Sequence, residues 1–265
     1  MNVLNREKQT IVLNLLLEGN SIRAIERMTN VHKITIASLL KRVGQACEEY
    51  HQKHIKGLNC THIQCDEVWS FCYAKEYNKE KGMTKDAGDV WTWTAIDADS
   101  RFMVSWHTGK RNLKDARQFF EDLSYRVDGK VKIAADGHPP YIKAIKESFG
   151  DRASFGQVVK LYDVGKNKRK YVGKIKKESV IGEMDDSEID TTKVERANLT
   201  MRTHLKRMNR KTPAFSKKLE NHKAAIAMHF MYYNFCKIHN ALKVTPAMEV
   251  GMSESIWPVD KLLEI

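Results

Sequence analysis

Between residues 61 and 162, strand-like and helix-like patterns follow one another in an order that few folds accommodate. Three runs rich in aromatic and β-branched residues come first: "HIQCDEVWSFCYA", then two runs within "DVWTWTAIDADSRFMVSWH". The helical pattern "NLKDARQFFEDLSYRV" leads to the short buried run "VKIAAD", and the helical pattern "YIKAIKESF" leads to "FGQVVKLY". Because a helical crossover returns a strand parallel to an earlier one, we expect an α/β fold with a mixed five-stranded sheet and flanking helices.

The first 55 residues show helical patterns instead. One helix is expected to stop at Gly19, a second to start at its N-cap Ser21 and end near Asn30, and a third to follow from about residue 33. A short helix, a tight turn and a longer helix form the helix-turn-helix pattern. We therefore interpret residues 1–55 as a helix-turn-helix DNA-binding domain, with a plain three-helix packing or dimerisation unit as the alternative.

In such a motif, the second helix lies in the major groove with its N-terminal residues at the base edges. Lys33, Thr35 and Ser38 are therefore expected at base edges, and Lys41 and Arg42 nearer to phosphates. The net charge of +12 and the pI near 9.4 favour a polyanionic partner, most simply nucleic acid. A basic enzyme without such a partner is the alternative on charge alone.

The remaining residues, 56–265, are expected to form one catalytic domain. Within it, residues 164–190 lack a clear period and change from basic to acidic, so we expect a flexible connection there, or one that becomes ordered when substrate binds. Two helices are expected to close the chain, over 192–210 and about 216–238. The second is apolar nearly all round, which predicts burial in a core or an interface.

Two aspartates stand where the strands can bring them together. Asp66 lies between apolar neighbours in its strand, where an unpaired charge is costly, and Asp136 ends a strand just before a turn. If these strands are adjacent and parallel, both carboxylates can converge at the end of the sheet where ligands commonly bind. Strand alternation puts Glu67 on the face opposite Asp66, and Asp97 and Asp99 are expected to be turn residues. A hydrogen-bonded structural aspartate at 66 and an Asx-type cap at 136 are the alternatives.

Glu195 is the only acid in the basic stretch "KVERANLTMRTHLKRMNRKTPAFSKK". At about 100° per residue, a polar helical stripe runs through Glu195, Asn198, Arg202, Lys206 and Asn209. The neighbouring stripe is apolar and can pack on the sheet: Val194, Ala197, Met201, Leu205 and Met208. This packing would bring Glu195 to the rim of the sheet, near a strand-end carboxylate. The alternative is an acid that interacts favourably with the helix dipole, which explains Glu195 alone.

Three carboxylates beside dense positive charge suit hard divalent cations with oxygen ligands. We therefore predict Asp66, Asp136 and Glu195 as catalytic and metal-binding residues for two Mg²⁺ ions, with Mn²⁺ as the alternative metal. His138 either assists this site or caps the turn. Further DNA-binding residues are expected near the site because they can hold the phosphate backbone: Arg196, Asn198, Arg202, Lys206 and Arg210.

Three blocks resemble the DDE transposases of the insertion-sequence-one family: "CDEVWSF", "AADGHPPY" and "VERANLTMRTHLKRMNRKTPAFSKK". The closing "TPAMEVGMSESIW" is also similar to the tail of insertion-sequence transposases. The resemblance spans about residues 60–258 and implies an RNase H-like fold, with Mg²⁺-dependent cut-and-join chemistry at transposon ends. Matched residue by residue, it implies the triad Asp66, Asp136 and Glu195. Members of that family often carry a zinc ribbon ahead of the helix-turn-helix, and this sequence shows none.

These observations predict a transposase that binds inverted repeats at transposon ends, hydrolyses a DNA strand and transfers its 3′-OH to target DNA. Double-stranded DNA is the expected partner. Because two ends must be processed, at least a homodimer is expected, with the helix over 216–238 as its candidate interface. Two alternatives remain open: another RNase H-like nuclease such as a junction resolvase, or a catalytically inactive helix-turn-helix regulator.

The composition also bears on the cellular compartment in which we expect the protein. No run of 18 or more apolar residues appears, and the N-terminal "MNVLNREKQT" lacks the apolar core of a secretory signal. The five cysteines form an odd set without CxxC spacing, which favours free thiols and makes a poor zinc site. We therefore expect a cytoplasmic, nucleoid-associated protein without a membrane span.

Overall fold

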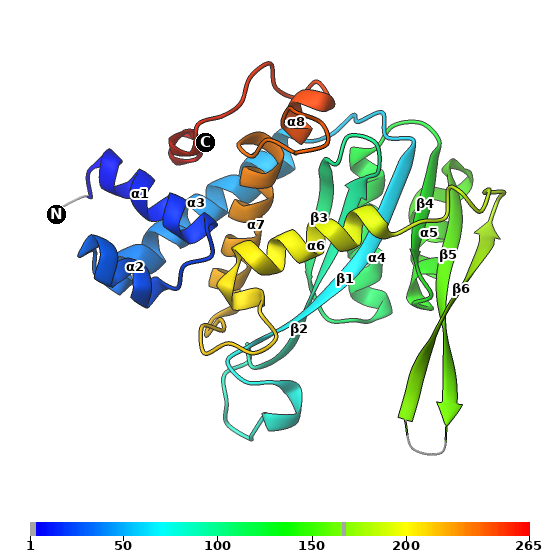
Figure 1. Ribbon diagram of the computed structural model, residues 1–265, viewed down its shortest axis with the longest axis horizontal. Coiled ribbons are helices and arrows are strands. Elements are labelled where there is room, and N and C mark those ends of the chain that lie inside the picture. The colour runs from blue at the N-terminus through cyan, green and yellow to red at the C-terminus, as the bar shows by residue number, and fades with distance from the viewer. Residues whose placement is uncertain (1–3, 166–167) are drawn as a thin grey trace. The chain divides into compact units, whose positions relative to one another are not determined.

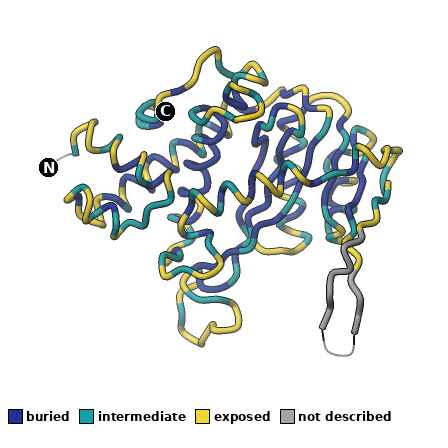
Figure 2. Tube along the Cα trace, viewed as in Figure 1, coloured by how far each residue is buried: buried dark blue, intermediate teal, exposed yellow. Residues whose placement is uncertain are grey.

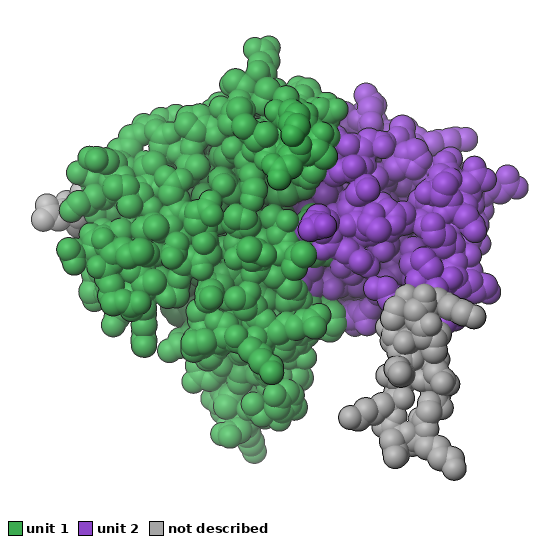
Figure 3. Space-filling model, in the orientation of Figure 1, with its two compact units in different colours: residues 1–55, 69–91, 197–265 green, residues 56–68, 92–196 purple. Residues whose placement is uncertain are grey.

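The computed structural model describes residues 4–165 and 168–265, with the side chains of residues 162–174 excepted. The chain divides into two compact units (Figure 3). Unit 1 holds residues 1–55, 69–91 and 197–265, and unit 2 holds residues 56–68 and 92–196. Each unit therefore contains segments that are far apart in the sequence.

A six-stranded sheet has the order β3-β2-β1-β4-β5-β6 (Figure 1). Its strands are β1 (His62–Cys72), β2 (Gly88–Asp97), β3 (Met103–Gly109), β4 (Val131–Asp136), β5 (Ala153–Gly165) and β6 (Lys168–Ile181). The expectation of a mixed α/β sheet with flanking helices is confirmed. Five strands match the expected runs, and the sixth, β6, was not expected.

The strand directions follow from the connections and the pairing. The His62 carbonyl of β1 accepts from the Ala98 N–H just after β2, and the Asp66 carbonyl of β1 accepts from the Thr94 hydroxyl in β2. The residue number therefore rises along β1 while that of the bonded residue of β2 falls. This pattern is that of antiparallel strands. Strand β1 pairs in parallel with β4, and β4 in parallel with β5. The two parallel pairs involve the strands reached through helical crossovers, as the element order predicts.

The expectation of a flexible connection over 164–190 was wrong for residues 168–181, because they form strand β6. It pairs antiparallel with β5, from the Phe155–Ile181 pair to the Gly165–Lys168 pair. It is also the edge strand of the sheet, and Ile175 and Lys176 are exposed. Edge strands commonly carry lysines that discourage pairing with other chains. A lysine-rich edge strand lacks the buried face that would give an apolar period, which explains why its sequence does not reveal it.

Helices α4 (Leu113–Arg126) and α5 (Pro140–Phe149) provide the crossovers of unit 2. Asn112 is the N-cap of α4, because its side chain accepts a hydrogen bond from the Asp115 N–H at 2.9 Å. Helix α4 buries Phe119, Phe120 and Leu123 and packs against α5 and β3. Buried residues also follow one another along the strands of the sheet (Figure 2). A short 3-10 helix, η2 (Gly150–Arg152), precedes β5.

Unit 1 is mostly helical. Its helices are α1 (Arg6–Leu17), α2 (Ile22–Thr29), α3 (Lys33–His54), α7 (Leu219–Phe235) and α8 (Pro246–Glu249), with the 3-10 helices η1 (Glu76–Asn78), η3 (Lys206–Met208) and η4 (Val259–Leu263). The three helices expected in the first 55 residues are confirmed. Helix α3 packs closely along α7, since a Cβ at Gly44 would lie 2.2 Å from the Ala224 carbonyl oxygen. The burial expected for the apolar helix over 216–238 is confirmed for α7.

Helix α6 (Thr192–His204) is shorter than the expected 192–210. The backbone becomes extended at Leu205, and a 3-10 turn follows. Arg202 holds this turn, because its guanidinium donates to the Met208 carbonyl at 2.6 Å. The expected apolar stripe is buried throughout: Val194, Ala197, Met201, Leu205 and Met208.

All five cysteines are free thiols, as their spacing predicts. In the part of the chain that the structure describes, every helix is too short or too polar to cross a lipid bilayer.

Candidate metal centre

The sheet register puts Asp66 and Asp136 at the same level of neighbouring strands. Strands β1 and β4 pair as His62–Lys132, Ile63–Ile133 and Gln64–Ala134, a constant offset of 70 residues (132 − 62). The same offset carried forward matches Asp66 with Asp136. Because strands that pair in parallel point the same way, both aspartates follow the paired segment toward the carboxyl ends of the strands, as the sequence predicts.

A third carboxylate joins them. One carboxylate oxygen from each of Asp66, Glu67 and Asp136 lies within 4.8 Å of the other two. We call these three residues the acidic cluster. The expectation that Glu67 stands apart from Asp66 was wrong. Alternation directs neighbouring side chains to opposite faces of a strand, but it does not fix how far apart their ends lie, and the Glu67 side chain is one carbon longer than that of an aspartate.

Glu67 is the buried member of the cluster. Its side chain is only 1% exposed, and its Oε1 has no hydrogen-bond partner in the described part of the chain. The nearest charges are the Arg111 Nε at 3.6 Å and the His138 Nε2 at 3.8 Å. Burial, reinforced by the nearby Asp136, raises the pKa of Glu67 to about 8. The fold therefore holds a carboxyl group in a place that favours its neutral form unless positive charge arrives.

Asp136 has two structural contacts as well. Its Oδ1 accepts a hydrogen bond from the His138 N–H at 3.0 Å, which is the Asx-type cap considered above. Its Oδ2 accepts from the Arg111 guanidinium at 3.4 Å. The carboxylate remains 42% exposed at the strand end, so the cap does not bury it.

His138 and Tyr141 line the buried side of the cluster. Their rings contact each other edge to face, with centroids 5.7 Å apart. Neither the His138 Nε2 nor the Tyr141 hydroxyl has a hydrogen-bond partner among the described residues. Burial, followed by the charge on Arg111, lowers the pKa of His138 to about 4, so this imidazole is neutral at pH 7. Burial and then Glu67 raise the pKa of Tyr141.

Glu195 lies on the Asp66 face of the sheet. Gln64, two residues before Asp66 and so on the same face of β1, accepts hydrogen bonds from the first backbone N–H groups of α6, Lys193 at 2.8 Å and Val194 at 3.1 Å. Glu195 is in this same first turn, and its Oε1 accepts from Lys160 of β5 at 3.3 Å.

No described oxygen of Glu195 joins the acidic cluster within 4.8 Å. The Glu195 carboxylate is 47% exposed and also accepts from the Thr191 hydroxyl at 3.3 Å. The structure therefore brings Asp66 and Asp136 together and puts Glu195 on the appropriate face, next to a lysine. Sequence reasoning missed Glu67 and Arg111; the only signal for Glu67 is its position beside Asp66.

Several of the predicted DNA-binding side chains lie around one groove of unit 1. The groove has a volume of about 860 Å³ and runs between the N-terminal half of α3 and the segment 205–221. It is lined by basic side chains from both sides: Arg23, Lys33, Lys41, Lys206, Arg207, Lys217 and Lys218. Ser38 lines it too, and Lys33, Thr35 and Ser38 are exposed as expected for base-edge residues. Lys41 already pairs with Glu220 at 2.8 Å.

Other predicted DNA-binding residues have structural contacts. Arg42 donates to the Gln9 side chain at 2.5 Å. Arg202 donates to the Trp69 carbonyl at 3.0 Å in addition to Met208, and Asn198 is buried. Asn198 and Arg202 lie within α6 and are turned into the protein, so these two positions of the expected polar stripe have structural contacts.

Arg196, Lys206 and Arg210 are exposed. Lys206 and Arg210 follow the end of α6, so the exposed positive charge lies on the segment after the helix as well as on the helix itself. Of the predicted phosphate contacts, Lys41, Lys206 and Arg210 lie in unit 1 and Arg196 lies in unit 2, and all four stay predictions.

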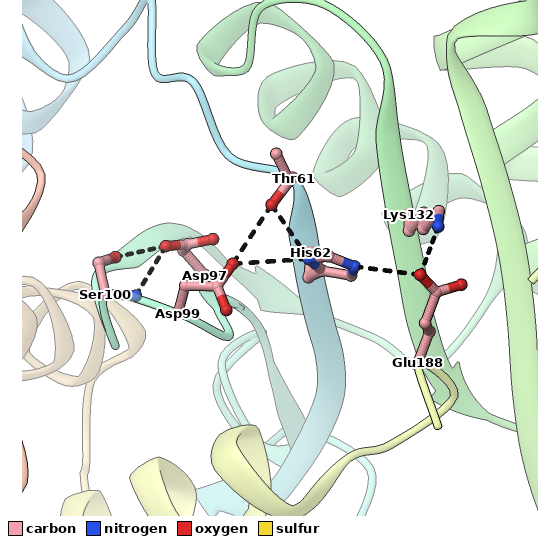
Figure 4. Close-up of polar contacts among 7 residues, drawn as sticks. All are labelled: Thr61, His62, Asp97, Asp99, Ser100, Lys132 and Glu188. Atoms are coloured by element: carbon pink, nitrogen blue, oxygen red, sulfur yellow. Dashed lines mark hydrogen bonds and ion pairs between the residues drawn. The ribbon is translucent and has the colours of Figure 1, made fainter. Parts of the chain in front are cut away.

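A second group of acids, beside the start of β1 and β4, contacts basic and hydroxyl side chains (Figure 4). Glu188 contacts Lys132 and lies 3.5 Å from the His62 Nε2, while Asp99 lies 3.5 Å from the His62 Nδ1 and accepts from Thr61 at 3.2 Å. We call these five residues the Glu188 network.

Asp97 lies beside this network and accepts from the Ser100 N–H at 2.9 Å (Figure 4). The backbone N–H of Asp97 in turn donates to the Phe102 carbonyl at 2.9 Å. The prediction that Asp97 and Asp99 are turn residues is confirmed.

The acidic cluster fits a hard divalent cation. All its potential ligands are carboxylate oxygens, which Mg²⁺ and Mn²⁺ favour over nitrogen or sulfur. The unpartnered, buried Glu67 Oε1 is an acceptor that a cation would satisfy. The site therefore suits chemistry in which oxygen-bound metal ions stabilise charge on phosphate oxygens.

Comparison with known proteins gives one informative match. Residues 154–236 match the family model described as IS1 transposase. The resemblance to the insertion-sequence-one transposases is thus confirmed over nearly all of β5 and all of β6, α6 and α7, and it supports transposase function. No curated protein matches.

Two solved structures are weakly similar. A piggyBac transposase synaptic complex with hairpin DNA gives a TM-score of 0.48 at 9% identity, covering 99% of this chain and 70% of that one. A pre-cleavage Mos1 transpososome gives a TM-score of 0.24 at 12% identity, covering 58% and 60%. Because both TM-scores lie below 0.5, neither contributes to the assignments that follow.

Proposed function

We propose that this protein is a DDE transposase that cleaves DNA at the ends of its own mobile element and joins the freed 3′-OH to target DNA. The observation that carries the proposal is the convergence of Asp66 and Glu67 of β1 with Asp136 at the end of the neighbouring parallel strand β4. The family match, which includes Glu195 in its basic helix, supports the same reaction class.

In this proposal Asp66, Asp136 and Glu195 hold divalent cations, most simply two Mg²⁺ ions. When bound, such ions lower the pKa of the attacking oxygen and neutralise charge on the leaving oxygen. The carboxylates position the scissile phosphate, and no Ser or Cys nucleophile is needed because water and then the DNA 3′-OH attack. Lys160, which pairs with Glu195, is available to neutralise a phosphate at the same rim.

DNA recognition is assigned to unit 1. Lys33, Thr35 and Ser38 at the start of α3 would contact base edges, and the lysines across the 860 Å³ groove would contact phosphates. Processing two ends requires two active sites, so the working form is at least a dimer. DNA as substrate implies action in the cytoplasm at the nucleoid.

A cleavage assay on native DNA tests the proposal. The substrate is a duplex that carries the reading frame with its flanking genomic DNA, incubated with purified protein, Mg²⁺ and a target plasmid. We expect nicks at two inverted repeats and joined products, with both abolished by EDTA. Asp136→Asn should lose cleavage while its DNA binding, measured by gel shift, stays within about threefold of wild type.

The matched control is Asp151→Asn, which removes an exposed aspartate of the same unit. This variant should cleave like the wild type. Nicking without joined products would favour an RNase H-like nuclease instead. Binding without any Mg²⁺-dependent nicking would favour the inactive regulator, and persistent cleavage by Asp136→Asn would refute the assignment of this residue.

A further inference from the structure

We propose that Glu67 is itself a ligand of the divalent cation held by Asp66 and Asp136, and that this cation binds without Glu195. The inference rests on the proposed function in that it concerns the same metal centre. It changes the ligand set, because it makes the residue next to Asp66 a member of the site and assigns Glu195 to a separate, second cation position.

Geometry is the first argument. Oxygen ligands on opposite sides of one Mg²⁺ or Ca²⁺-sized ion lie roughly 4–5 Å apart, since each sits about 2.0–2.6 Å from the metal. The three carboxylate oxygens of the acidic cluster lie within 4.8 Å of one another. One ion can therefore reach all three with little movement of the side chains.

Burial is the second argument. A carboxylate whose side chain is 1% exposed needs a partner, because an unsatisfied buried acceptor destabilises the fold. His138 Nε2 is 3.8 Å from Glu67 Oε1, beyond hydrogen-bond distance, and this oxygen has no hydrogen-bond partner among the described residues. The Tyr141 hydroxyl favours the charged form of Glu67, but burial outweighs it. The buried Oε1 is therefore an acceptor that a cation would satisfy.

Positive charge is the third argument. The Arg111 guanidinium lies 3.6 Å from Glu67 Oε1 and 3.4 Å from Asp136 Oδ2, so it contacts both carboxylates that the ion would bridge. Both distances exceed those of a well-formed charged hydrogen bond. Arg111 is one-third exposed, in the loop between β3 and α4.

Glu195 differs from Glu67 in its exposure and in its hydrogen-bond partners. Its carboxylate is 47% exposed, and it accepts hydrogen bonds from Lys160 and Thr191, both at 3.3 Å. Its charge is therefore already compensated by a lysine and a hydroxyl. This arrangement suits a carboxylate that becomes a metal ligand only when the substrate and a second metal ion bind.

The experiment measures cation binding to the full-length protein without DNA. Mn²⁺ is titrated calorimetrically into the wild type, Glu67→Gln and Glu195→Gln, with Glu183→Gln as the control for loss of an exposed acid. We expect Glu67→Gln to weaken the tightest site at least about tenfold, and Glu195→Gln to change it by less than about threefold. Circular dichroism establishes that each variant is folded.

A second measurement separates ligation from indirect disturbance. Tb³⁺ luminescence lifetimes in H₂O and D₂O count the water molecules bound to the ion, and Trp93, with its ring centroid 5.8 Å from that of His138, is placed to sensitise the emission. Loss of a carboxylate ligand should add at least one bound water in Glu67→Gln, while Glu67→Asp, which keeps a carboxylate, should recover part of the affinity.

The inference is overturned if Glu67→Gln binds Mn²⁺ within about threefold of wild type, if its water count is unchanged, or if the wild type shows no saturable binding. These results do not depend on DNA cleavage. If the wild type binds Mn²⁺ through Glu67 but neither cleaves nor joins DNA, the proposed function fails while the ligand assignment stands. If Glu67→Gln cleaves DNA normally and its Mn²⁺ affinity is unchanged, the ligand assignment fails while the proposed function stands.

Discussion

Two groups of acids in unit 2 lie beside strands β1 and β4, and the protein treats them differently. At the start of these strands, Glu188 is paired with Lys132, His62 and the Asp185 N–H, and the Lys132 contact foremost lowers its pKa to about 2. Further along β1, burial raises the pKa of Glu67 to about 8, although Arg111 lies 3.6 Å from it. The fold therefore favours the charged form of Glu188 and disfavours that of Glu67, which a bound cation would reverse.

The largest contrast should appear between two aspartates of the two groups. Asp66→Asn should reduce Mg²⁺-dependent strand cleavage more than about 100-fold, because even residues behind metal ligands change function by about 10–100-fold when removed. Asp99→Asn, in the Glu188 network, should keep cleavage within about threefold of wild type. Rates on the native end substrate measure both. Similar losses in the two variants would show that the groups do not differ in function.

A smaller contrast should appear between two cations. Arg111 contacts the acidic cluster and Lys132 contacts Glu188. Arg111→Gln should tighten Mn²⁺ binding by roughly 3- to 10-fold, because a nearby positive charge that repels the ion and occupies its ligands is removed. Lys132→Gln should leave it within about twofold. The measurement is calorimetric titration at fixed ionic strength, and weaker binding in Arg111→Gln would mean that this arginine supports the site rather than competing for it.

The smallest effect concerns pH and stability. The pKa of Glu188 is lowered from 4.5 to about 2, so its favourable interactions are fully present above pH 4.5 and are lost as the pH falls through about 2. Glu188→Gln should therefore show a shallower loss of thermal stability than wild type between these pH values, while being less stable at pH 7. Melting temperatures from pH 7 to pH 2 test this. An unchanged slope would mean that the Glu188 network contributes little to acid stability.

Most of the sheet could be predicted because its strands alternate or are buried. The β1 to β5 runs contain residues such as Ile63, Trp93 and Val131 whose burial produces a recognisable pattern. The N-cap Asn112 was equally readable, since an Asn side chain satisfies exposed N–H groups at a helix start. Strand β6 could not be predicted, because its described side chains are exposed or half-buried at the edge of the sheet and so show no apolar period.

The candidate site was predicted in part. Asp66 and Asp136 follow from strand order, since parallel neighbours bring their carboxyl ends to one edge of the sheet. Glu67 did not follow, because alternation assigns it to the other face of β1, and the sequence does not reveal that its longer side chain brings a carboxylate oxygen within 4.8 Å of the two aspartates. The end of α6 was equally hidden: Arg202 bonds the Met208 and Trp69 carbonyls, a tertiary contact that no helical period predicts.

The close contact between Gly44 and Ala224 has a consequence for how the protein is made. Helix α3 finds its packing partner, α7, only after the ribosome has added the roughly 165 residues between His54 and Leu219. At about 5–20 residues per second, this delay is roughly 10–30 s. During that interval the apolar face of α3 has no α7 to cover it, so the first helices made are among the last to be locked in place.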